Sequence, residues 1–206
     1  MQDTDKKSRK GLKITAIVIL SMVLVHFILT LCFVLVDYNY NSKLTSEEGV
    51  ISNQYDEPFA SFKYGGLGNV KANGCGAVAV YNIMRLEGKN VSFSDVVKYF
   101  DVNGNYLYGK FGTRPSKIIS YLKNYGFDVG FAFFEENFDN VAKQCKYTIF
   151  LYVGEVEGQM GGHYQLLTQY NNRTGKYLSI NPSKNVSFPD LLKMTDKCFK
   201  MIIYIK

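Results

Sequence analysis

The longest apolar run of the chain, residues 14–36, reads ITAIVILSMVLVHFILTLCFVLV and contains no charged side chain. A helix rises about 1.5 Å per residue, so about 20 apolar residues cross the roughly 30 Å hydrocarbon layer of a bilayer. The run is longer than the apolar region of a cleaved signal peptide. It also ends at Phe33-Val34-Leu35-Val36, without the small residues of a cleavage site. The pattern therefore predicts an uncleaved transmembrane signal anchor over residues 14–36.

His26 is the one strongly polar residue inside this run. An ionisable side chain in the middle of a membrane helix can mark a functional site. The simpler interpretation is a neutral imidazole that a long apolar helix tolerates, and we favour that interpretation from the sequence.

The charges beside the apolar run give the expected orientation. Residues 1–13 hold five basic and two acidic side chains, whereas Lys43 is the only basic residue in 37–56. The positive-inside rule therefore predicts a cytoplasmic tail over 1–13 and places residues 37–206 outside the cytoplasm, anchored to the cell membrane by a single pass. Residues 37–62 are polar and lack a clear period, which predicts a linker. The globular domain is then expected over residues 63–206.

The first half of this domain has helical periodicity. Apolar residues recur at three- and four-residue spacing, and Gly and Pro lie where helices end or begin. The expected helices are 77–88 behind Cys75, 94–100 with Ser94 as N-cap, and 114–125 with Thr113 as N-cap and Pro115 in the first turn.

The second half is rich in aromatic and β-branched residues, which favour strands. Strands are expected over 127–134, 147–153, 163–170, 176–180 and 198–205, with short helices over 135–145 and 188–194. Helices come first and a largely antiparallel sheet follows. The order predicts an α+β fold in which N-terminal helices pack on an antiparallel sheet.

Composition narrows the classes of function. The 206 residues suffice for one membrane segment and one domain, and the net charge of +6 is spread without a basic cluster beyond residue 13. This argues against a nucleic-acid partner, which would require a concentrated basic stripe. One histidine outside the apolar run and scattered cysteines give no metal-ligand spacing, and no phosphate-binding loop is present, so we expect neither a metal nor a cofactor.

Cysteine use leaves two arrangements open. Cys32 lies in the apolar run, and Cys75, Cys145 and Cys198 lie in the domain. Three cysteines outside the cytoplasm permit one internal disulfide and leave one thiol over. A Cys145–Cys198 disulfide would leave Cys75 free, but the sequence does not establish that those two residues are close.

Cys75 has the surroundings of a nucleophile. It lies between Gly74 and Gly76 at the start of the predicted helix, where the helix dipole and a neighbouring imidazolium can lower the pKa of a thiol. His163 is the only histidine outside the apolar run, so it is the only candidate for that imidazole.

A histidine in such a pair needs a partner that holds its ring. Asn181 lies where the next strand ends, and in adjacent antiparallel strands the start of one lies beside the end of the other. We therefore expect His163 and Asn181 to be neighbours. Each of the three residues alone fits an ordinary structural role, and it is their occurrence together that favours catalysis.

Three strings carry a resemblance to a known family: Asn73-Gly74-Cys75-Gly76-Ala77-Val78-Ala79, Gly162-His163-Tyr164-Gln165-Leu166-Leu167 and Ser179-Ile180-Asn181-Pro182-Ser183. They resemble the C39-like branch of the papain-fold cysteine peptidases over roughly residues 64–206. The resemblance implies a papain-like fold, with Cys75 as nucleophile, His163 as general base and acid, and Asn181 as the residue that orients His163.

The family's oxyanion hole implies a role for one more residue. It combines the backbone N–H of the nucleophile, here Cys75, with a side-chain amide six residues earlier, which here is Asn69. The family usually has a Gln at that place, so the amide of Asn69 is one methylene shorter.

The resemblance implies an extracytoplasmic cysteine peptidase acting on a peptide or protein, such as a secreted leader peptide cut after small residues. Any role in export would require a separate export partner. Acyl transfer on the same triad is an alternative, because both reactions pass through an acyl-enzyme. Asn69 keeps open a catalytically inactive papain-like binding module. A weaker alternative is a structural or immunity-type membrane protein whose motifs are coincidental.

Overall fold

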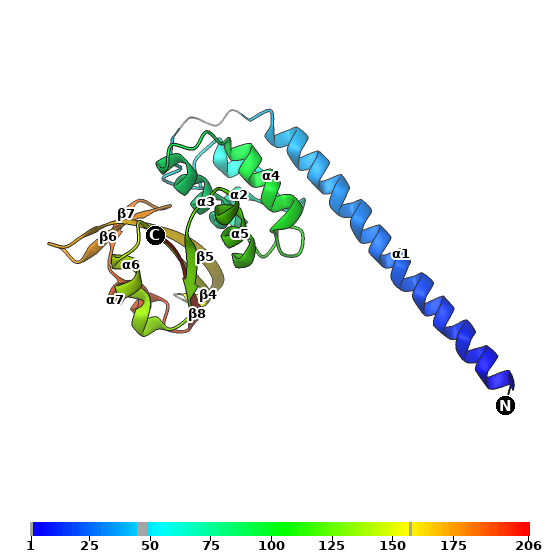
Figure 1. Ribbon diagram of the computed structural model, residues 1–206. Coiled ribbons are helices and arrows are strands. Elements are labelled where there is room, and N and C mark those ends of the chain that lie inside the picture. The colour runs from blue at the N-terminus through cyan, green and yellow to red at the C-terminus, as the bar shows by residue number, and fades with distance from the viewer. Residues whose placement is uncertain (1, 45–48, 157) are drawn as a thin grey trace.

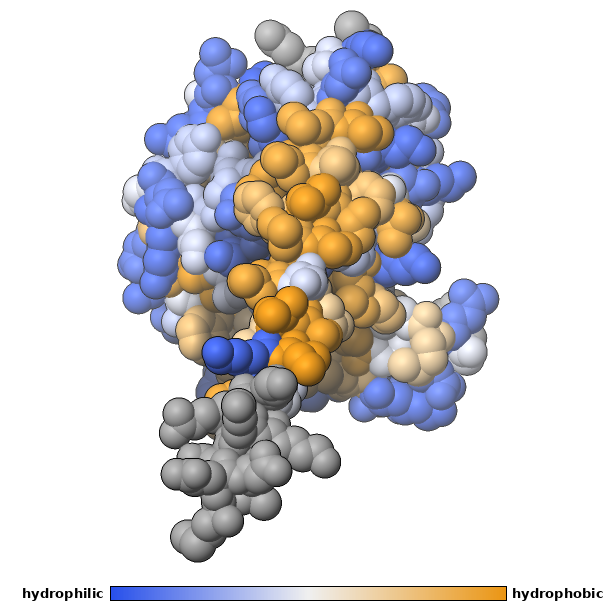
Figure 2. All heavy atoms as spheres, turned by 90° about the vertical axis from the view of Figure 1, so that its right-hand side faces the viewer, coloured by the Kyte–Doolittle hydropathy of each residue, from blue (hydrophilic) through white to orange (hydrophobic). Residues whose placement is uncertain are grey.

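A long helix and a globular body make up the molecule (Figure 1). The computed structural model describes residues 2–44, 49–156 and 158–206, with side chains from residue 11 onward. Helix α1, Gln2–Asn41, leads away from the body and has the N-terminus at its far end. Among the described residues it is the one helix long and apolar enough to cross a membrane. In Figure 2, which views the molecule from the side of this helix, hydrophobic side chains form a continuous band above the grey N-terminal residues.

The first layer of the body is helical. It contains α2 (Val70–Asn73), α3 (Cys75–Leu86), α4 (Phe93–Asn103) and α5 (Pro115–Asn124), with the 3-10 helix η1 (Phe59–Ser61) and the short hairpin of β1 (Lys63–Tyr64) and β2 (Gly68–Asn69). Helix α3 is buried along its length from Cys75 to Met84, so it is the central helix of this layer. Its residues are apolar on nearly every side, as expected for a helix enclosed by neighbours.

The second layer is a six-stranded antiparallel sheet of order β3-β8-β4-β5-β6-β7. Its strands are β3 (Val129–Ala132), β4 (Tyr147–Val156), β5 (Gln159–Asn171), β6 (Lys176–Ile180), β7 (Lys184–Val186) and β8 (Cys198–Ile205). The predicted α+β class is confirmed. Strand 176–180 and helix 188–194 coincide with the predicted ranges, as does strand 198–205.

The sheet is covered on both faces, because its strands alternate between two cores. Ile149, Leu151 and Leu166 pack toward α3, whereas Phe150 and Leu167 face the other way. That second core is closed by α6 (Phe138–Lys143) and α7 (Phe188–Met194), which lie across the sheet from α2–α5 (Figure 1). The 3-10 helix η2 (Glu135–Asn137) leads into α6. The body therefore has three layers. The sequence predicted helices packed on the sheet, and the structure adds a second helical layer, α6 and α7, on the opposite face.

Two predicted N-caps are wrong by one or two residues. Helix α4 begins at Phe93, and its N-cap is Ser92 instead of Ser94. The Ser92 hydroxyl accepts a hydrogen bond from the Asp95 N–H. The start shifts because Phe93 is itself buried in the core. Arg114 occupies the N-cap position of α5, while the Thr113 hydroxyl instead bonds to the Tyr64 hydroxyl.

The polar segment 37–62 is not a free linker in its described parts. Residues up to Asn41 continue α1, and Ile51 and Phe62 are fully buried. Both backbone polar groups of Ile51 bond to the buried Asn82 side chain, at 2.6 and 2.9 Å. Isolated anchor residues hold this segment on the body, and isolated anchors produce no periodic pattern. Residues 45–48 of the predicted linker lie outside the described residues.

The Cys145–Cys198 disulfide is not formed, and all four cysteines are free thiols. Strand β8 explains why. Cys198 pairs with Gly154 at one end of the sheet, whereas Cys145 immediately precedes the opposite end, where Tyr147 pairs with Ile205. Seven residues of strand at roughly 3.3 Å each separate the two ends, far beyond the reach of a disulfide.

Candidate active site

Cys75 is the first residue of α3 and is buried, with 6% of its surface exposed. The backbone N–H groups of the first helical turn have no acceptor within the helix, and they make this end electropositive. Gly76 is required next to it, because a side chain there would come within 2.7 Å of Thr113. The sequence Gly-Cys-Gly thus lets the helix start pack closely against Thr113.

His163 is the direct partner of the Cys75 thiol. Burial raises the pKa of Cys75, but the hydrogen bond and positive charge of His163, together with the backbone N–H groups of Tyr164 and Gly76, outweigh burial and lower that pKa overall. Burial lowers the pKa of His163, but its bond to Cys75 and its contact with Asn181 raise it overall. The opposed shifts favour a thiolate–imidazolium pair.

The strands bring His163 beside Asn181, as expected from their antiparallel pairing. His163 lies on β5, Asn181 follows β6, and the register pairs Leu166 with Ile180. The His163 Nε2 lies 3.0 Å from the backbone carbonyl oxygen of Asn181. This contact leaves the other ring nitrogen for Cys75.

Asn181 contacts the histidine through its main chain and not through its side chain. Its side chain is bound elsewhere: the Gln54 N–H donates to its Oδ1 at 2.8 Å, and its Nδ2 donates to Gln54 Oε1 at 2.7 Å. Asn181 also has a positive φ of 66°, a conformation that Asn adopts more readily than most residues. The residue therefore serves as a turn that presents its carbonyl.

Gln54 is a residue of the site that the sequence did not reveal. It is 2% exposed, and its Nε2 also donates to the Lys71 carbonyl at 2.9 Å. It thus ties the turn that holds His163 to helix α2, directly before Cys75. It comes from the polar segment after α1, where a single Gln among polar residues gives no signal in one sequence.

Asn69, the expected side-chain donor of the oxyanion hole, has its amide oxygen bound within the chain. It is the N-cap of α2, and its Oδ1 accepts from the Ala72 N–H at 2.8 Å. Among the described residues, Asn73 rather than Asn69 lines the cavity beside Cys75. The backbone N–H of Cys75, the other expected donor, lies in the first turn of α3, where N–H groups have no acceptor within the helix.

A groove of about 640 Å³ opens beside Cys75. One wall is formed by residues between Tyr106 and Thr113, and the other is formed by β4, β5 and β8. Three large apolar side chains on these walls are exposed: Phe111 at 69%, Met160 at 81% and Phe199 at 56%. Lys110 is the one formally charged residue among those that line it. The groove suits an apolar peptide segment better than a charged small molecule.

The described residues contain no group of three or more His, Cys, Asp and Glu placed to hold a metal ion. Cys75 and His163 supply a thiol and an imidazole beside the groove, and the start of α3 adds main-chain dipoles.

The comparisons with known proteins concern the fold. No family model and no curated protein matches the sequence. One similar solved structure is the peptidase domain of Streptococcus ComA, a bi-functional ABC transporter involved in quorum sensing. The TM-score is 0.45 at 15% identity, over 64% of this chain and 89% of that one.

A second similar structure is a double glycine motif protease from an AMS/PCAT transporter, solved in complex with the leader peptide. The TM-score is 0.44 at 14% identity, over 64% of this chain and 84% of that one. Both similarities are distant, with TM-scores below 0.5 and sequence identities of 15% or less. The roles of individual residues have to come from their own contacts in this chain.

Proposed function

We propose that this chain is a membrane-anchored cysteine peptidase whose domain lies outside the cytoplasm. The observation that carries the proposal is the contact between Cys75 and His163 at the start of a buried helix, with the pKa of the thiol lowered and that of the imidazole raised. A cysteine that served only to fill the core would keep a raised thiol pKa, because burial alone disfavours the thiolate.

The reaction begins at the Cys75 thiolate, which attacks the carbonyl carbon of a peptide bond and forms a C–S bond. The carbonyl oxygen becomes an oxyanion, which the backbone N–H at the start of α3 stabilises. The His163 imidazolium donates its proton to the leaving amine as the C–N bond breaks. The product of this half is a thioester on Cys75.

Water completes the reaction. His163, now neutral, takes a proton from a water molecule that attacks the thioester carbonyl, and the C–S bond breaks to release the acid and the thiolate. The Asn181 carbonyl holds His163 in one orientation through both halves, since it accepts from Nε2–H. An amine in place of water would give acyl transfer on the same residues.

The groove supports a peptide substrate. Its apolar walls would accept hydrophobic side chains, and Gly161 and Gly162 lie on the β5 wall next to His163, where a peptide backbone can approach closely. A catalytically inactive binding module could use the same groove, but it would have no need of a lowered thiol pKa.

The membrane part of the proposal rests on α1 and its charges. The helix contains the uncharged run 14–36, and five basic residues precede that run. The helix side chains from Gly11 onward are largely exposed. These features support an anchor with the N-terminus in the cytoplasm.

Cleavage of a peptide library by the purified full chain in detergent tests the function. We expect cleavage by the wild type, with a Cys75-linked acyl adduct visible by mass spectrometry at short times. Cys75→Ala should abolish both signals, whereas Cys145→Ala should retain both because that thiol lies far from His163. Cleavage that persists in Cys75→Ala would contradict the proposal.

A further inference from the structure

The globular body holds α1 in a fixed direction. The Gly66 N–H donates to Asp37 Oδ2 at 2.6 Å, and Asn41 exchanges two hydrogen bonds with the Lys63 backbone at 2.7 and 2.9 Å. Lys98 of α4 lies 3.7 Å from the centre of the Tyr38 ring. These contacts fall within the last two turns of the helix and hold the body against it. The position of α1 in a bilayer therefore sets the position of the body.

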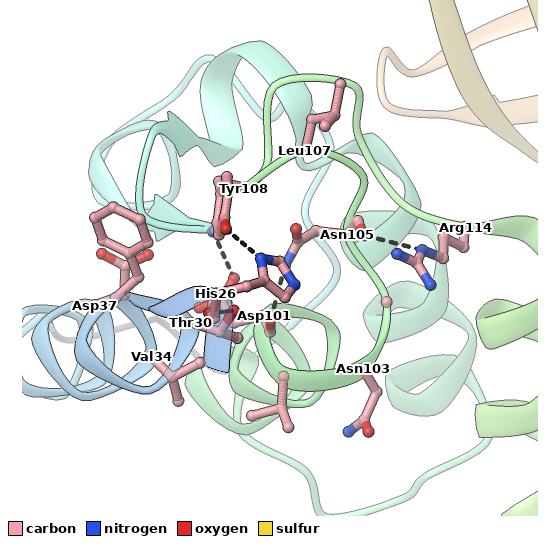
Figure 3. A pocket seen from close by; sticks show the side chains of 14 residues that line it. His26, Thr30, Val34, Asp37, Asp101, Asn103, Asn105, Leu107, Tyr108 and Arg114 are labelled. Atoms are coloured by element: carbon pink, nitrogen blue, oxygen red, sulfur yellow. Dashed lines mark hydrogen bonds between the residues drawn. The ribbon is translucent and has the colours of Figure 1, made fainter. Parts of the chain in front are cut away.

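The loop 105–112 of the body extends along α1 toward the N-terminal, apolar part of that helix. The Tyr108 hydroxyl bonds to His26, and its ring lies 5.5 Å from the His26 ring and 5.4 Å from the Phe33 ring. Figure 3 shows Tyr108 and His26 facing one another across the cavity between the loop and α1, with Thr30 beside them. His26 is thus partnered by the body, which differs from the interpretation of a solitary tolerated imidazole.

The depth of this loop follows from helix geometry. Tyr108 lies at the level of Thr30, seven residues before Asp37, the first charged residue after the apolar run. At about 1.5 Å per residue, the loop reaches about 10 Å below Asp37 along the helix. A bilayer that takes up residues 14–36 would therefore meet the loop in its headgroup and upper acyl region, which lies about 5–10 Å below the surface.

The loop has the side chains of a membrane interface. Leu107 lies on the loop at the edge of the cavity in Figure 3 and is 65% exposed. Phe111 is 69% exposed and Tyr106 44%. Lys110 lies between them in the sequence and can reach lipid phosphates, while aromatic rings favour the headgroup level.

The backbone of the loop is also suited to such a place. Irregular backbone is costly near hydrocarbon unless its polar groups are paired. Here the Tyr106 N–H donates to the Gly112 carbonyl at 3.0 Å, the Gly109 N–H to the Tyr106 carbonyl at 3.1 Å, and the Lys110 N–H to the Leu107 carbonyl at 3.3 Å. The loop closes on itself, so that the exposed part is mainly side chain.

We propose that the loop 105–112 rests in the headgroup and upper acyl region of the same bilayer that α1 crosses, with the phospholipid surface as its partner. This inference rests on the membrane anchoring of the proposed function and extends it to the site. The loop is also one wall of the groove beside Cys75, through Tyr106, Lys110 and Phe111. The groove then opens at the lipid surface, and its substrate class is a peptide segment that lies on the membrane or emerges from it.

Tryptophan fluorescence tests the inference sharply, because the chain contains no Trp. Leu107→Trp in the full chain places a single fluorophore at the tip of the loop. The protein is reconstituted in phosphatidylcholine vesicles that carry bromine either near the top of the acyl chains or near the bilayer centre. Leu86→Trp at the C-terminal end of α3 is the matched control, since Leu86 is an exposed leucine of the same domain. Val23→Trp marks the middle of the apolar run.

We expect the emission of Leu107→Trp to shift to shorter wavelength in vesicles and to be quenched most by the shallow bromines. Leu86→Trp should remain unquenched, and Val23→Trp should be quenched most by the deep bromines. If Val23→Trp is quenched but Leu107→Trp behaves like Leu86→Trp, the loop lies in water and the inference fails while the anchor stands. If Val23→Trp is not quenched, anchoring and inference fail together. Neither result depends on Cys75 chemistry, so the cleavage experiment is judged separately.

Discussion

At the scale of single residues, two members of the site contribute side chains and one contributes a main-chain group. Asn181 supplies the main-chain carbonyl that contacts His163. Cys75 and His163 act through side chains, and their pairing could be predicted from the sequence because a thiolate needs an imidazole and only one histidine lies outside the apolar run. Asn181 could be placed next to His163 from strand order, but its contact could not be predicted. The partner that takes its side chain, Gln54, lies 127 residues away and belongs to no pattern.

A prediction about Asn181 follows from this division. Asn181→Gly keeps the carbonyl that accepts from His163 Nε2 and tolerates the φ of 66°. We expect kcat/KM to fall by only about 30-fold, because two hydrogen bonds to Gln54 are lost and each contributes about 1 kcal/mol. His163→Ala should reduce it by several orders of magnitude. Peptide cleavage rates of the two variants check this, and equally severe losses would show that the Asn181 side chain is itself needed for catalysis.

At the scale of elements, the sequence predicts bounds best where apolar residues recur on one face of a helix or strand. The strand 176–180 and the helix 188–194 have the predicted bounds, because their apolar residues alternate or recur with the period of the element. The N-caps of α4 and α5 were misplaced, because several polar residues could fill each position and burial of a neighbour decides between them. Segment 49–62 packs on the body through single buried residues such as Ile51 and Phe62, and isolated residues leave no periodic pattern in the sequence.

Helix α4 contributes a buried carboxyl with a consequence for stability. Asp101 is 4% exposed and accepts from the Gly65 N–H, and burial, with the nearby Asp37, raises its pKa from 3.8 to about 8. Between these values the folded chain holds a proton that the unfolded chain has lost. The free energy of unfolding should therefore fall as pH rises from about 4 to about 8 and level off above that.

Asp101→Asn should remove this dependence and make the protein more stable than the wild type at pH 9, because an amide can still accept from Gly65 and carries no charge. Thermal unfolding of the full chain in micelles at acid and alkaline pH measures the effect. Asp128→Asn, at a carboxylate with 73% of its side chain exposed, should leave the pH dependence of the wild type unchanged. An Asp101→Asn profile parallel to that of the wild type would contradict the assigned burial cost.

At the scale of the whole molecule, α1 and the globular body are joined by direct contacts. Hydrogen bonds at Asp37 and Asn41 fix α1 to the helical layer, and Gln54 joins the segment after α1 to the turn that holds His163. The sequence predicted an anchor, a linker and a domain as separate parts, because the apolar run is conspicuous and the polar segment is not. The structure joins them, so that under the proposed function the membrane would orient the groove and the segment after α1 would support the Cys75–His163 pair.

The central claim is that His163 activates Cys75, and the pH dependence of thiol alkylation tests it most directly. The full chain in micelles is treated with iodoacetamide over a range of pH, and mass spectrometry locates the label. We expect Cys75 to label at a lower pH than an ordinary thiol, because its pKa is lowered, and Cys145 to label only at a higher pH, because burial raises its pKa. In His163→Ala, early labelling of Cys75 should disappear while Cys145 is unchanged. If Cys75 labels slowly with the profile of an ordinary thiol, and His163→Ala makes no difference, the chain has no activated nucleophile and the catalytic account is wrong.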